Sequence, residues 1–314
     1  MASPKSNPKA RVLVVGSCSI DMIVQVGRIP SIGETVIGGK FHSAGGGKGA
    51  NQAVSAARAG ASVEFVGRVG RDDFGKNIVA GLKADGIDVS RIQVDPREPS
   101  GIAFIFVGGG GENSIAVASG ANLRLVPGDV SRAGSSFKKG GTLLVQLETP
   151  LAVVSAAVSL ARKRGMRVIL NPAPARALPD ALLRKVDIIT PNEHEAESLT
   201  GVKVDGEEAA GRAADCLHGR GVGTVIITLG ARGAFVSSGS GGSLVPAFKT
   251  RAIDTTAAGD VFSGALAVAL AEGRPLLEAV RFAQAAASIS VTRIGAQPSA
   301  PGRAEIERLL KRTA

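Results

Sequence analysis

The strongest chemical signal in the chain is the segment Asp254 to Asp260 (DTTAAGD), which precedes the apolar run VFSGALAVALAEG. Small residues in front of such a predicted helix leave backbone N–H groups without intrahelical partners, which suits a phosphate group. Asp260 falls in the first turn, where the helix dipole favours an ionised carboxylate. We predict that Asp260 is a general base and that Ala257, Ala258 and Gly259 form an anion hole for phosphoryl transfer. An ordinary helix N-terminus is the alternative.

A second signal is the glycine-rich segment Gly45 to Gln52 (GGGKGANQ), which also opens a predicted helix. The glycines allow the backbone to approach a ligand closely, and Lys48 and Asn51 offer polar groups for hydroxyls. The segment is not a P-loop, because GxxxxGK[ST] occurs nowhere in the chain. A dinucleotide fingerprint, GxGxxA, fits the glycines, but the residues in front of it, KFHSA, make a poor buried strand.

Acidic residues follow two predicted strands, where open α/β sheets bind ligands. Asp21 is the last residue of GSCSID, a few residues after the end of the first predicted strand. Glu148 is the last residue of LLVQLE. A lone Asp at such a place is more often a turn residue. Together with Lys48 and Asn51, however, the two acids predict a ring of hydrogen-bonding groups for a polyol.

Two further segments also lie at predicted strand ends. Thr190 to Glu195 (TPNEHE) offers carboxylates for a hydrated Mg²⁺ near phosphates, and Thr228 to Gly233 (TLGARG) offers backbone amides and Arg232 for a nucleotide. Each segment also has an alternative interpretation without a ligand. The first would be an ordinary capped helix start, and the second a plain strand–loop–strand connection. His194 lacks an HExxH spacing, and we interpret it as a solvated side chain.

The elements that position these residues alternate between short apolar strands and helical patterns. This alternation is typical of a mostly parallel sheet with helices on both faces, a three-layer α/β fold. Strands are predicted at 11–15, 63–67, 143–147, 167–170, 187–190 and 224–228, and helices at 50–59, 151–164, 206–218 and through 258–310.

Two stretches, 22–40 and 101–119, interrupt this alternation and resemble antiparallel strand pairs. We expect them to form a small separate β lid over the ligand site. An exposed small sheet needs a partner, which favours a homodimer through the lid. Residues 1–10 are predicted to be a disordered tail, and 11–314 a single α/β domain.

Composition excludes several classes of protein. The 314 residues include no Trp, no Tyr and ten Phe, so the core must be aliphatic. The net charge of +10 is scattered without interleaved aromatic residues, which argues against nucleic-acid binding and favours attraction of anionic ligands. No apolar run approaches the ~20 residues of a membrane span, and no signal peptide is recognisable, so we expect a cytoplasmic protein. The two cysteines suggest neither a disulfide nor a zinc site.

From about Val12 to Gly302, the chain resembles the ribokinase-type family of sugar kinases, which includes fructokinases and adenosine kinases. NPAPAR followed by PNE looks like the ribokinases themselves. The motifs that carry the resemblance are GETV at 33–36, GGKGANQA at 46–53, GAN at 120–122, QLE at 146–148, LNPAPAR at 170–176, TPNEHEAE at 190–197, ITLGARG at 227–233, DTTAAGD at 254–260 and GAQPS at 295–299.

The resemblance implies transfer of phosphate from ATP to ribose, giving ribose 5-phosphate and ADP, with Mg²⁺ beside the nucleotide and K⁺ as an activator. The catalytic residues that it implies are Asp260 and the anion hole. It places Ser19, Asp21, Gly47, Lys48, Gly49, Asn51, Glu148 and Asp260 around the sugar. It places Asn192, Thr228, Gly230, Ala231, Arg232, Gly233, Gly259 and Gln284 around the nucleotide, with Glu195 tied to Mg²⁺ and phosphate. The implied K⁺ site uses Asp254, Thr256, Ser290, Arg293, Gly295 and Ser299.

Two departures from the family pattern leave alternatives open. Ser19 stands where many bacterial members carry Asn, which puts discrimination between ribose and 2-deoxyribose in question. Gln284 stands where His or Asn is common near the adenine. The alternatives are a kinase for 2-deoxyribose or another sugar or nucleoside on the same fold, and a non-catalytic sugar-binding regulatory protein. An NAD-dependent dehydrogenase would rest on the weak glycine match alone.

Overall fold

The computed structural model describes residues 10–110, 112–239 and 241–312, so all but Ala10 of the predicted disordered tail lies outside the described residues. A nine-stranded sheet with the order β13-β12-β11-β10-β9-β8-β1-β4-β5 forms the centre. The pairs from β11 to β5 are parallel, whereas the pairs β11–β12 and β12–β13 are antiparallel, so β12 alone runs against the other strands. The mostly parallel sheet is therefore confirmed. Its strands are β1 Arg11–Val15, β4 Ser62–Gly70, β5 Asp88–Asp95, β8 Thr142–Val145, β9 Arg167–Leu170, β10 Ile188–Ile189, β11 Thr224–Thr228, β12 Ala234–Ser237 and β13 Gly242–Val245.

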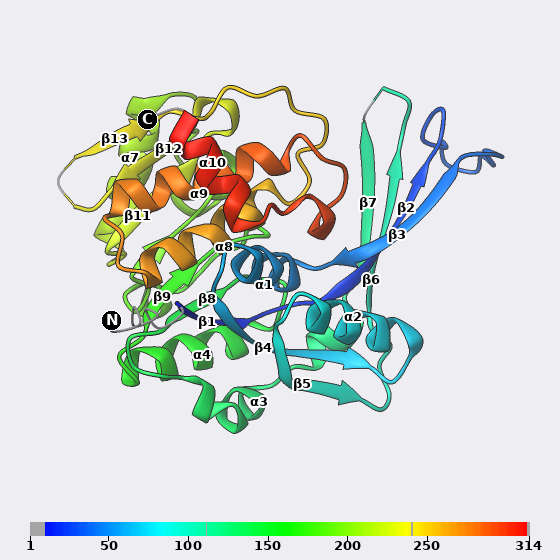
Figure 1. Ribbon diagram of the computed structural model, residues 1–314, viewed down its shortest axis with the longest axis horizontal. Coiled ribbons are helices and arrows are strands. Elements are labelled where there is room, and N and C mark those ends of the chain that lie inside the picture. The colour runs from blue at the N-terminus through cyan, green and yellow to red at the C-terminus, as the bar shows by residue number, and fades with distance from the viewer. Residues whose placement is uncertain (1–9, 111, 240, 313–314) are drawn as a thin grey trace, which may run out of the picture.

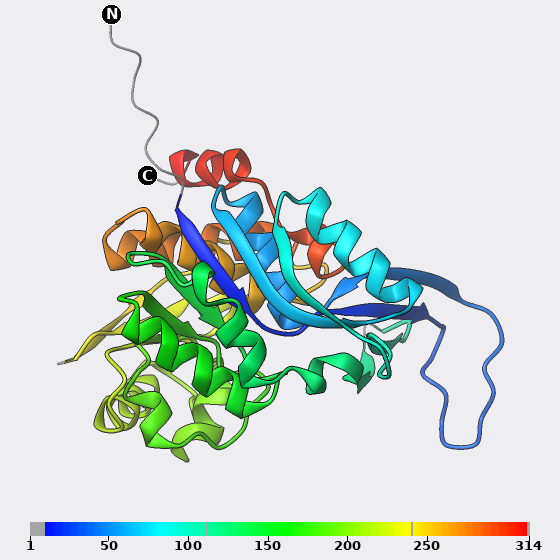
Figure 2. The ribbon, with the colours of Figure 1, turned by 90° about the horizontal axis from the view of Figure 1, so that it is seen from below.

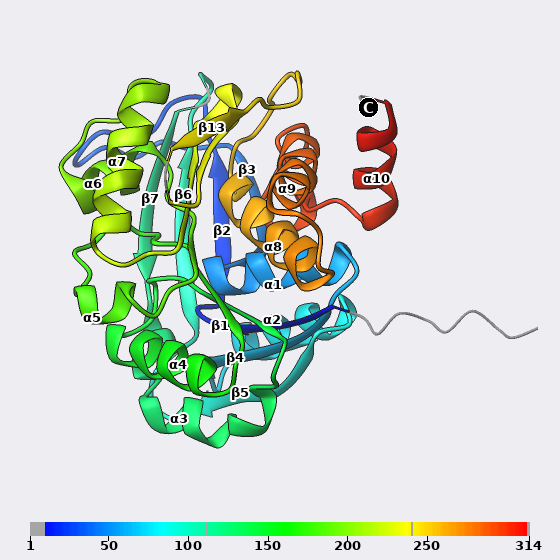
Figure 3. The same ribbon diagram turned by 90° about the vertical axis from the view of Figure 1, so that its left-hand side faces the viewer.

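Helices cover both faces of this sheet, as Figure 3 shows. Alternate residues of β1 point to opposite layers, because side chains along a strand alternate between its faces. Val12 and Val14 join one buried cluster, and Leu13 and Val15 the other. The first layer contains α1 Lys48–Arg58, α2 Asp73–Ala84, α8 Ala258–Ala271, α9 Leu276–Ser290 and α10 Arg303–Arg312. The second contains α3 Pro127–Arg132, α4 Leu151–Lys163, α5 Asp180–Leu183, α6 Glu193–Thr200 and α7 Glu207–Gly219.

A separate four-stranded sheet rises from one end of the main body as the predicted lid (Figure 1). It has the order β3-β2-β6-β7, with β2 and β6 parallel and the outer pairs antiparallel. Its strands are β2 Ser19–Gln25, β3 Lys40–Gly46, β6 Gly101–Val107 and β7 Asn113–Ala118. The pair predicted within 101–119 corresponds to β6 and β7.

The pair predicted within 22–40 is wrong in its bounds. The strands β2 and β3 lie on either side of residues 26–39, which form a long projecting loop (Figure 2). Gly33, Gly38 and Gly39 have positive φ angles, which interrupt extended structure there. The segment KFHSA is part of β3 and is exposed, which is why it did not resemble a buried strand.

The lid grows out of the carboxyl edge of the main sheet. β1 ends at Val15 and the chain enters β2 four residues later, while β3 leads directly into α1. Asp21 consequently lies inside a lid strand, so the alternative interpretation of Asp21 as a turn residue is wrong. Among the described residues, no helix has both the length and the apolar character that crossing a bilayer requires.

Candidate active site

The predicted base, Asp260, is buried at the start of α8, with 5 % of its surface exposed. Its Oδ1 accepts a hydrogen bond of 2.9 Å from Gln52 Nε2, and its Oδ2 accepts one of 3.1 Å from Asn51 Nδ2. Burial raises the pKa of Asp260 above its ordinary value, and the nearby Lys48 ammonium and the two amides oppose that change. The carboxylate is thus fixed in place with a second lone pair free on each oxygen.

The predicted anion hole lies directly in front of this carboxylate. Ala257, at the N-cap of α8, has a left-handed backbone with φ of 59°, and it is the one non-glycine residue with positive φ in the described part of the chain. Such strain is typical of functional sites. The Ala258 N–H donates to Thr255 O over 3.2 Å, whereas no hydrogen bond found among the described residues uses the Gly259 N–H. The turn therefore presents a free donor at a helix N-terminus.

A cavity of about 150 Å³ opens in front of the anion hole. It lies at the carboxyl ends of β9, β10 and β11, where open α/β sheets bind ligands. The structure thus brings together the predicted base, the anion hole, Lys48 and part of the predicted nucleotide site. The lining residues are Lys48, Asn171, Ala173, Thr190, Asn192, Glu195, Thr228, Thr255, Ala257, Ala258, Gly259 and Asp260.

The predicted sugar residues approach the same carboxylate from the side of the lid. Glu148 Oε2 accepts hydrogen bonds from Ser17 Oγ at 2.5 Å and from Lys48 N at 2.9 Å. Asp21 is buried in β2, directly over Gly46. Asp260, Lys48, Asp21 and Glu148 act on one another electrostatically. Asp21, Lys48, Asn51 and Glu148, the four members of the predicted ring, thus lie around Asp260, and their role in holding a polyol stays a prediction.

Two glycines of the predicted sugar site allow tight backbone packing here. Gly47 has φ of 84°, and a Cβ there would lie 2.8 Å from the Cα of Cys18. A Cβ at Gly49 would lie 2.6 Å from Ser17 O. Ser19, in contrast, lines a different cavity of about 240 Å³ between β3 and α2. The structure does not place Ser19 on the wall of the Asp260 cavity.

Because Asp21 is predicted to belong to the sugar site, we predict that sugar binding is sensitive to pH. Burial, followed by the charge of Glu148, raises the pKa of Asp21 to about 6, although the Ser19 side chain acts in the opposite direction. A protonated carboxyl group loses acceptor capacity, so KM for the sugar should rise as the pH falls through about 6. Initial rates between pH 5 and 8 would measure this, and Asp21→Asn should remove the rise. A KM that is flat across this range would contradict the assignment.

The predicted nucleotide residues are partly committed to other contacts. Arg232 pairs with Glu193 at 2.8 Å and donates to Asp205 O at 2.7 Å. Asn192 and Glu195 form a capping box at the start of α6, which confirms the capped-helix interpretation. Both also line the cavity, and their contact with a ligand stays a prediction. Gly230 and Ala231 share a 3-10 turn with Arg232, and Gly233 follows it with φ of 115°.

Gln284 is buried in α9, and its Nε2 donates to Val245 O over 2.6 Å. Its Oε1 is buried without a hydrogen-bond partner among the described residues. An acceptor in that state suits a ligand amine, because an unsatisfied buried polar atom is costly.

The residues of the implied K⁺ site come together in part. The Asp254 carboxylate accepts hydrogen bonds from Thr256 N and Gly295 N, both of 2.8 Å, and so joins the two loops. Arg293 instead pairs with Glu305. The hydroxyls of Ser290 and Ser299 bond backbone carbonyls three residues earlier in the chain. No cluster of three or more His, Cys, Asp or Glu side chains suited to a metal occurs in the described ranges, so carbonyl oxygens would have to supply most ligands.

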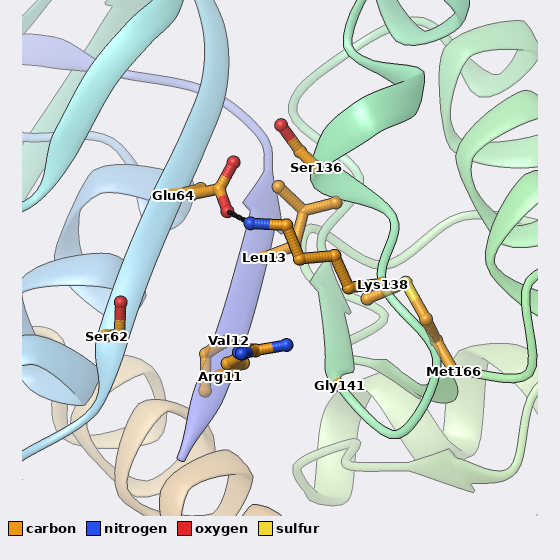
Figure 4. Close-up of a pocket in the computed structure, with 9 residues that line it drawn as sticks. All are labelled: Arg11, Val12, Leu13, Ser62, Glu64, Ser136, Lys138, Gly141 and Met166. Atoms are coloured by element: carbon orange, nitrogen blue, oxygen red, sulfur yellow. Dashed lines mark hydrogen bonds and ion pairs between the residues drawn. The ribbon is translucent and has the colours of Figure 1, made fainter. Parts of the chain in front are cut away.

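Another hollow, of about 40 Å³, contains none of the predicted residues (Figure 4). It lies at the amino ends of β1, β4, β8 and β9, opposite the edge used by the Asp260 cavity. Lys138 Nζ closes one side of it by bonding Glu64 Oε1 over 3.1 Å. Its size and its place at the wrong edge of the sheet do not suit a nucleotide or a sugar.

Comparison with known proteins accounts for this geometry. Residues 9–303 match the pfkB family carbohydrate kinases. The chain belongs to this family. It is 48 % identical to a ribokinase of Haemophilus influenzae over 95 % of this chain and 97 % of the relative. It is 38 % identical to a deoxyribokinase of Salmonella typhi, over 92 % and 95 % respectively.

A solved structure is similar in both sequence and fold. Ribokinase of Arabidopsis thaliana, complexed with ribose and ATP, has a TM-score of 0.88 and 34 % identity, covering 97 % of this chain and 99 % of that one. The predicted fold class, a three-layer sugar-kinase fold with a β lid, is thereby confirmed.

Sequence reasoning missed several residues of the cavity and its support. Asn171, Thr190 and Thr255 line the cavity, and Ser17 holds Glu148. Each falls at a strand end or in a motif that drew attention for a neighbouring residue. Asn171, for instance, begins NPAPAR.

Proposed function

We propose that the protein transfers the terminal phosphate of ATP to the 5-hydroxyl of D-ribose, giving ribose 5-phosphate and ADP, with residues 11–314 acting as one kinase domain. The observation that carries this proposal is the buried Asp260 carboxylate beside the free Gly259 N–H, in a cavity at the carboxyl edge of the sheet. The relatives at 38–48 % identity that are named ribokinases support ribose as the sugar.

In the reaction, the ribose hydroxyl oxygen attacks the terminal phosphorus while its proton passes to the Asp260 carboxylate. The bond between that phosphorus and the bridging oxygen breaks, and its electron pair leaves with ADP. The N–H groups of the turn at 257–259 and the Lys48 ammonium offset the negative charge spread over the transferred phosphoryl group. Asp21, Asn51 and Glu148 hold the sugar so that its 5-hydroxyl faces Asp260.

Two metal ions accompany this proposal. Glu195 and Asn192 would hold a hydrated Mg²⁺ against the nucleotide phosphates, which suits an ion that retains much of its water. The Mg²⁺ neutralises phosphate charge when bound. The loops joined by Asp254 would hold K⁺ beside the anion hole, mainly through carbonyl oxygens.

We place the reaction in the cytoplasm, and we propose a homodimer through the lid. Large apolar side chains of the lid are exposed in the single chain, and every residue of β7 is exposed. Burying such a surface against a second lid would remove both the apolar exposure and an open sheet edge. The exposed apolar residues on the strands are Phe41, Phe104, Ile115 and Val117.

The decisive experiment measures ADP release with Mg²⁺-ATP, with and without K⁺, for ribose, 2-deoxyribose, fructose and adenosine. Ribose-dependent turnover is expected, and it should be higher with K⁺. Turnover on another compound would reassign the pocket within the same fold. Absence of turnover on all four would favour the non-catalytic sugar-binding alternative.

Although Ser19 lies outside the wall of the Asp260 cavity, its side chain acts on the Asp21 carboxylate of the proposed sugar site, so we expect it to influence discrimination between ribose and 2-deoxyribose. A shorter side chain than Asn gives up a hydrogen bond to a ring hydroxyl, a difference of about 1–3 kcal/mol. The 38 % identity to a deoxyribokinase gives this second substrate specific support. We expect comparable kcat/KM for the two sugars, and a preference for ribose raised about 5- to 150-fold by Ser19→Asn. A strong preference for ribose in the unaltered protein would contradict this.

A further inference from the structure

We propose that Gln52 is a positioning residue for the reaction, and that it holds the Asp260 carboxylate at the reacting hydroxyl through a buried chain of amides that also includes Gln146 and Asn171. This inference rests on the proposed function. None of the three amides entered the site predicted from the sequence. Gln52 and Gln146 do not line the Asp260 cavity, so their role must pass through another residue.

The contacts form a continuous chain. Gln146 Nε2 donates to Gln52 Oε1 over 2.5 Å, and Gln52 Nε2 donates both to Asp260 Oδ1 over 2.9 Å and to Asn171 Oδ1 over 3.0 Å. Asn171 Nδ2 in turn donates to Thr190 O over 2.9 Å. Gln52 is fully buried, and Gln146 is 1 % exposed. Bonds in such a dry environment are stronger than in water.

The orientation of every amide in the chain is determined by its partners. Thr190 O is a backbone carbonyl and can only accept, so Asn171 must turn its NH₂ toward it and its oxygen toward Gln52. Gln52 must therefore present its NH₂ to Asn171, and the same group reaches Asp260. The reverse orientation would place the Gln52 oxygen against a carboxylate.

The backbone makes room for this arrangement. A Cβ at Gly16 would lie 2.2 Å from Gln146 Oε1, so only glycine leaves the space that this amide occupies. A Cβ at Gly264 of α8 would lie 2.5 Å from Gln52 O. The close approach of α1 to α8 that Gly264 allows brings the Gln52 side chain within hydrogen-bond distance of Asp260.

The chain of buried amides also favours the ionised form of Asp260, which the reaction needs. A base must be ionised, yet burial disfavours the charged form. The Gln52 hydrogen bond lowers the pKa of Asp260, together with Lys48 and Asn51. Asp21 in β2, Glu148 after β8 and Glu195 in α6 face the same carboxylate and repel its charge. Loss of the Gln52 donor should therefore shift ionisation of Asp260 to higher pH.

The test compares Gln52→Met, Gln146→Met and Ser55→Ala in the full chain by pH profiles of kcat and kcat/KM. Gln52→Met should lower kcat about 10- to 100-fold, the effect of one hydrogen bond to a charged group, and move the acidic limb to higher pH. Gln146→Met should act in the same direction but less. Ser55→Ala is the matched control, because Ser55 Oγ bonds Val261 O over 2.8 Å between the same two helices without touching Asp260. Ser55→Ala should lower the melting temperature and leave both pH profiles unchanged.

A double-variant cycle separates positioning from a general structural role. In an Asp260→Asn background, Gln52→Met should have almost no further effect on residual turnover, because its effect passes through the missing carboxylate. An acidic limb unchanged in both glutamine variants, or full additivity with Asp260→Asn, would overturn the proposal. If Gln52→Met does not fold, the Gln146→Met profile decides alone. Absence of turnover in the unaltered protein would instead overturn the proposed function.

Discussion

Replacing Asp260 with Asn should lower kcat by about 10²–10⁴-fold while ribose and ATP still bind, because the variant loses the proton acceptor and little else. The substituted side chain keeps the shape of the original. Its oxygen can still accept from Gln52, and its new NH₂ group can face Asn51 if that amide turns over. Asn51 Oδ1 has no hydrogen-bond partner in the described part of the chain, so it is available to accept.

Binding should be measured by calorimetry, since the chain has no Trp or Tyr to report by fluorescence. Ser263→Ala is a suitable control, because Ser263 lies in the same helix, one turn further on, and bonds Thr190 Oγ1 over 3.2 Å without contacting Asp260. It should leave kcat nearly unchanged. Near-normal turnover by Asp260→Asn would mean that another group takes the proton, and the mechanism above would be wrong.

The sequence predicted six of the nine strands of the main sheet, β1, β4 and β8 to β11, because their signals are local, whereas β5, β12 and β13 were not predicted as strands. Buried parallel strands such as Arg11–Val15 and Thr224–Thr228 are continuous apolar runs, and the helices between them have a clear period. β3 was missed because it belongs to an exposed lid, where most side chains face water and the pattern of burial is lost. A strand of this type is determined by its pairing with β2, which joins residues distant along the chain.

The site was predictable where one short segment carries both geometry and chemistry, as in the turn from Ala257 to Asp260. Residues that act through long-range contacts gave no such signal. Gln52 meets Asp260 across 208 positions of sequence, and Gln146 meets Gln52 across 94. Sequence spacing also could not show that Arg232 forms an ion pair with Glu193. That pair depends on how the turn after β11 packs against the start of α6.

The lid and the main body meet at Gly46, and replacing this glycine with Ala should cause a second large loss of activity. A Cβ there would lie 1.9 Å from Asp21 Oδ1 and 2.3 Å from its Cγ, so Gly46→Ala must displace the Asp21 carboxylate from its place in the proposed sugar site. Each hydrogen bond lost between a charged acceptor and a sugar hydroxyl is worth about 1.5–3 kcal/mol. We expect kcat/KM for ribose to fall by about 10²-fold or more, mainly through KM, with little change in KM for ATP.

Gly45→Ala is the matched control, because the neighbouring glycine faces the opposite side of the same strand. A Cβ there would meet the end of the Gln297 side chain, which is long enough to move aside. Initial-rate kinetics on both variants should therefore separate a local effect on Asp21 from distortion of β3. In an Asp21→Ala background, Gly46→Ala should add almost nothing, because the side chain it displaces is gone. Equal losses of kcat/KM in Gly45→Ala and Gly46→Ala would instead mean that the lid strand itself is disturbed, and that Asp21 does not set the affinity for the sugar.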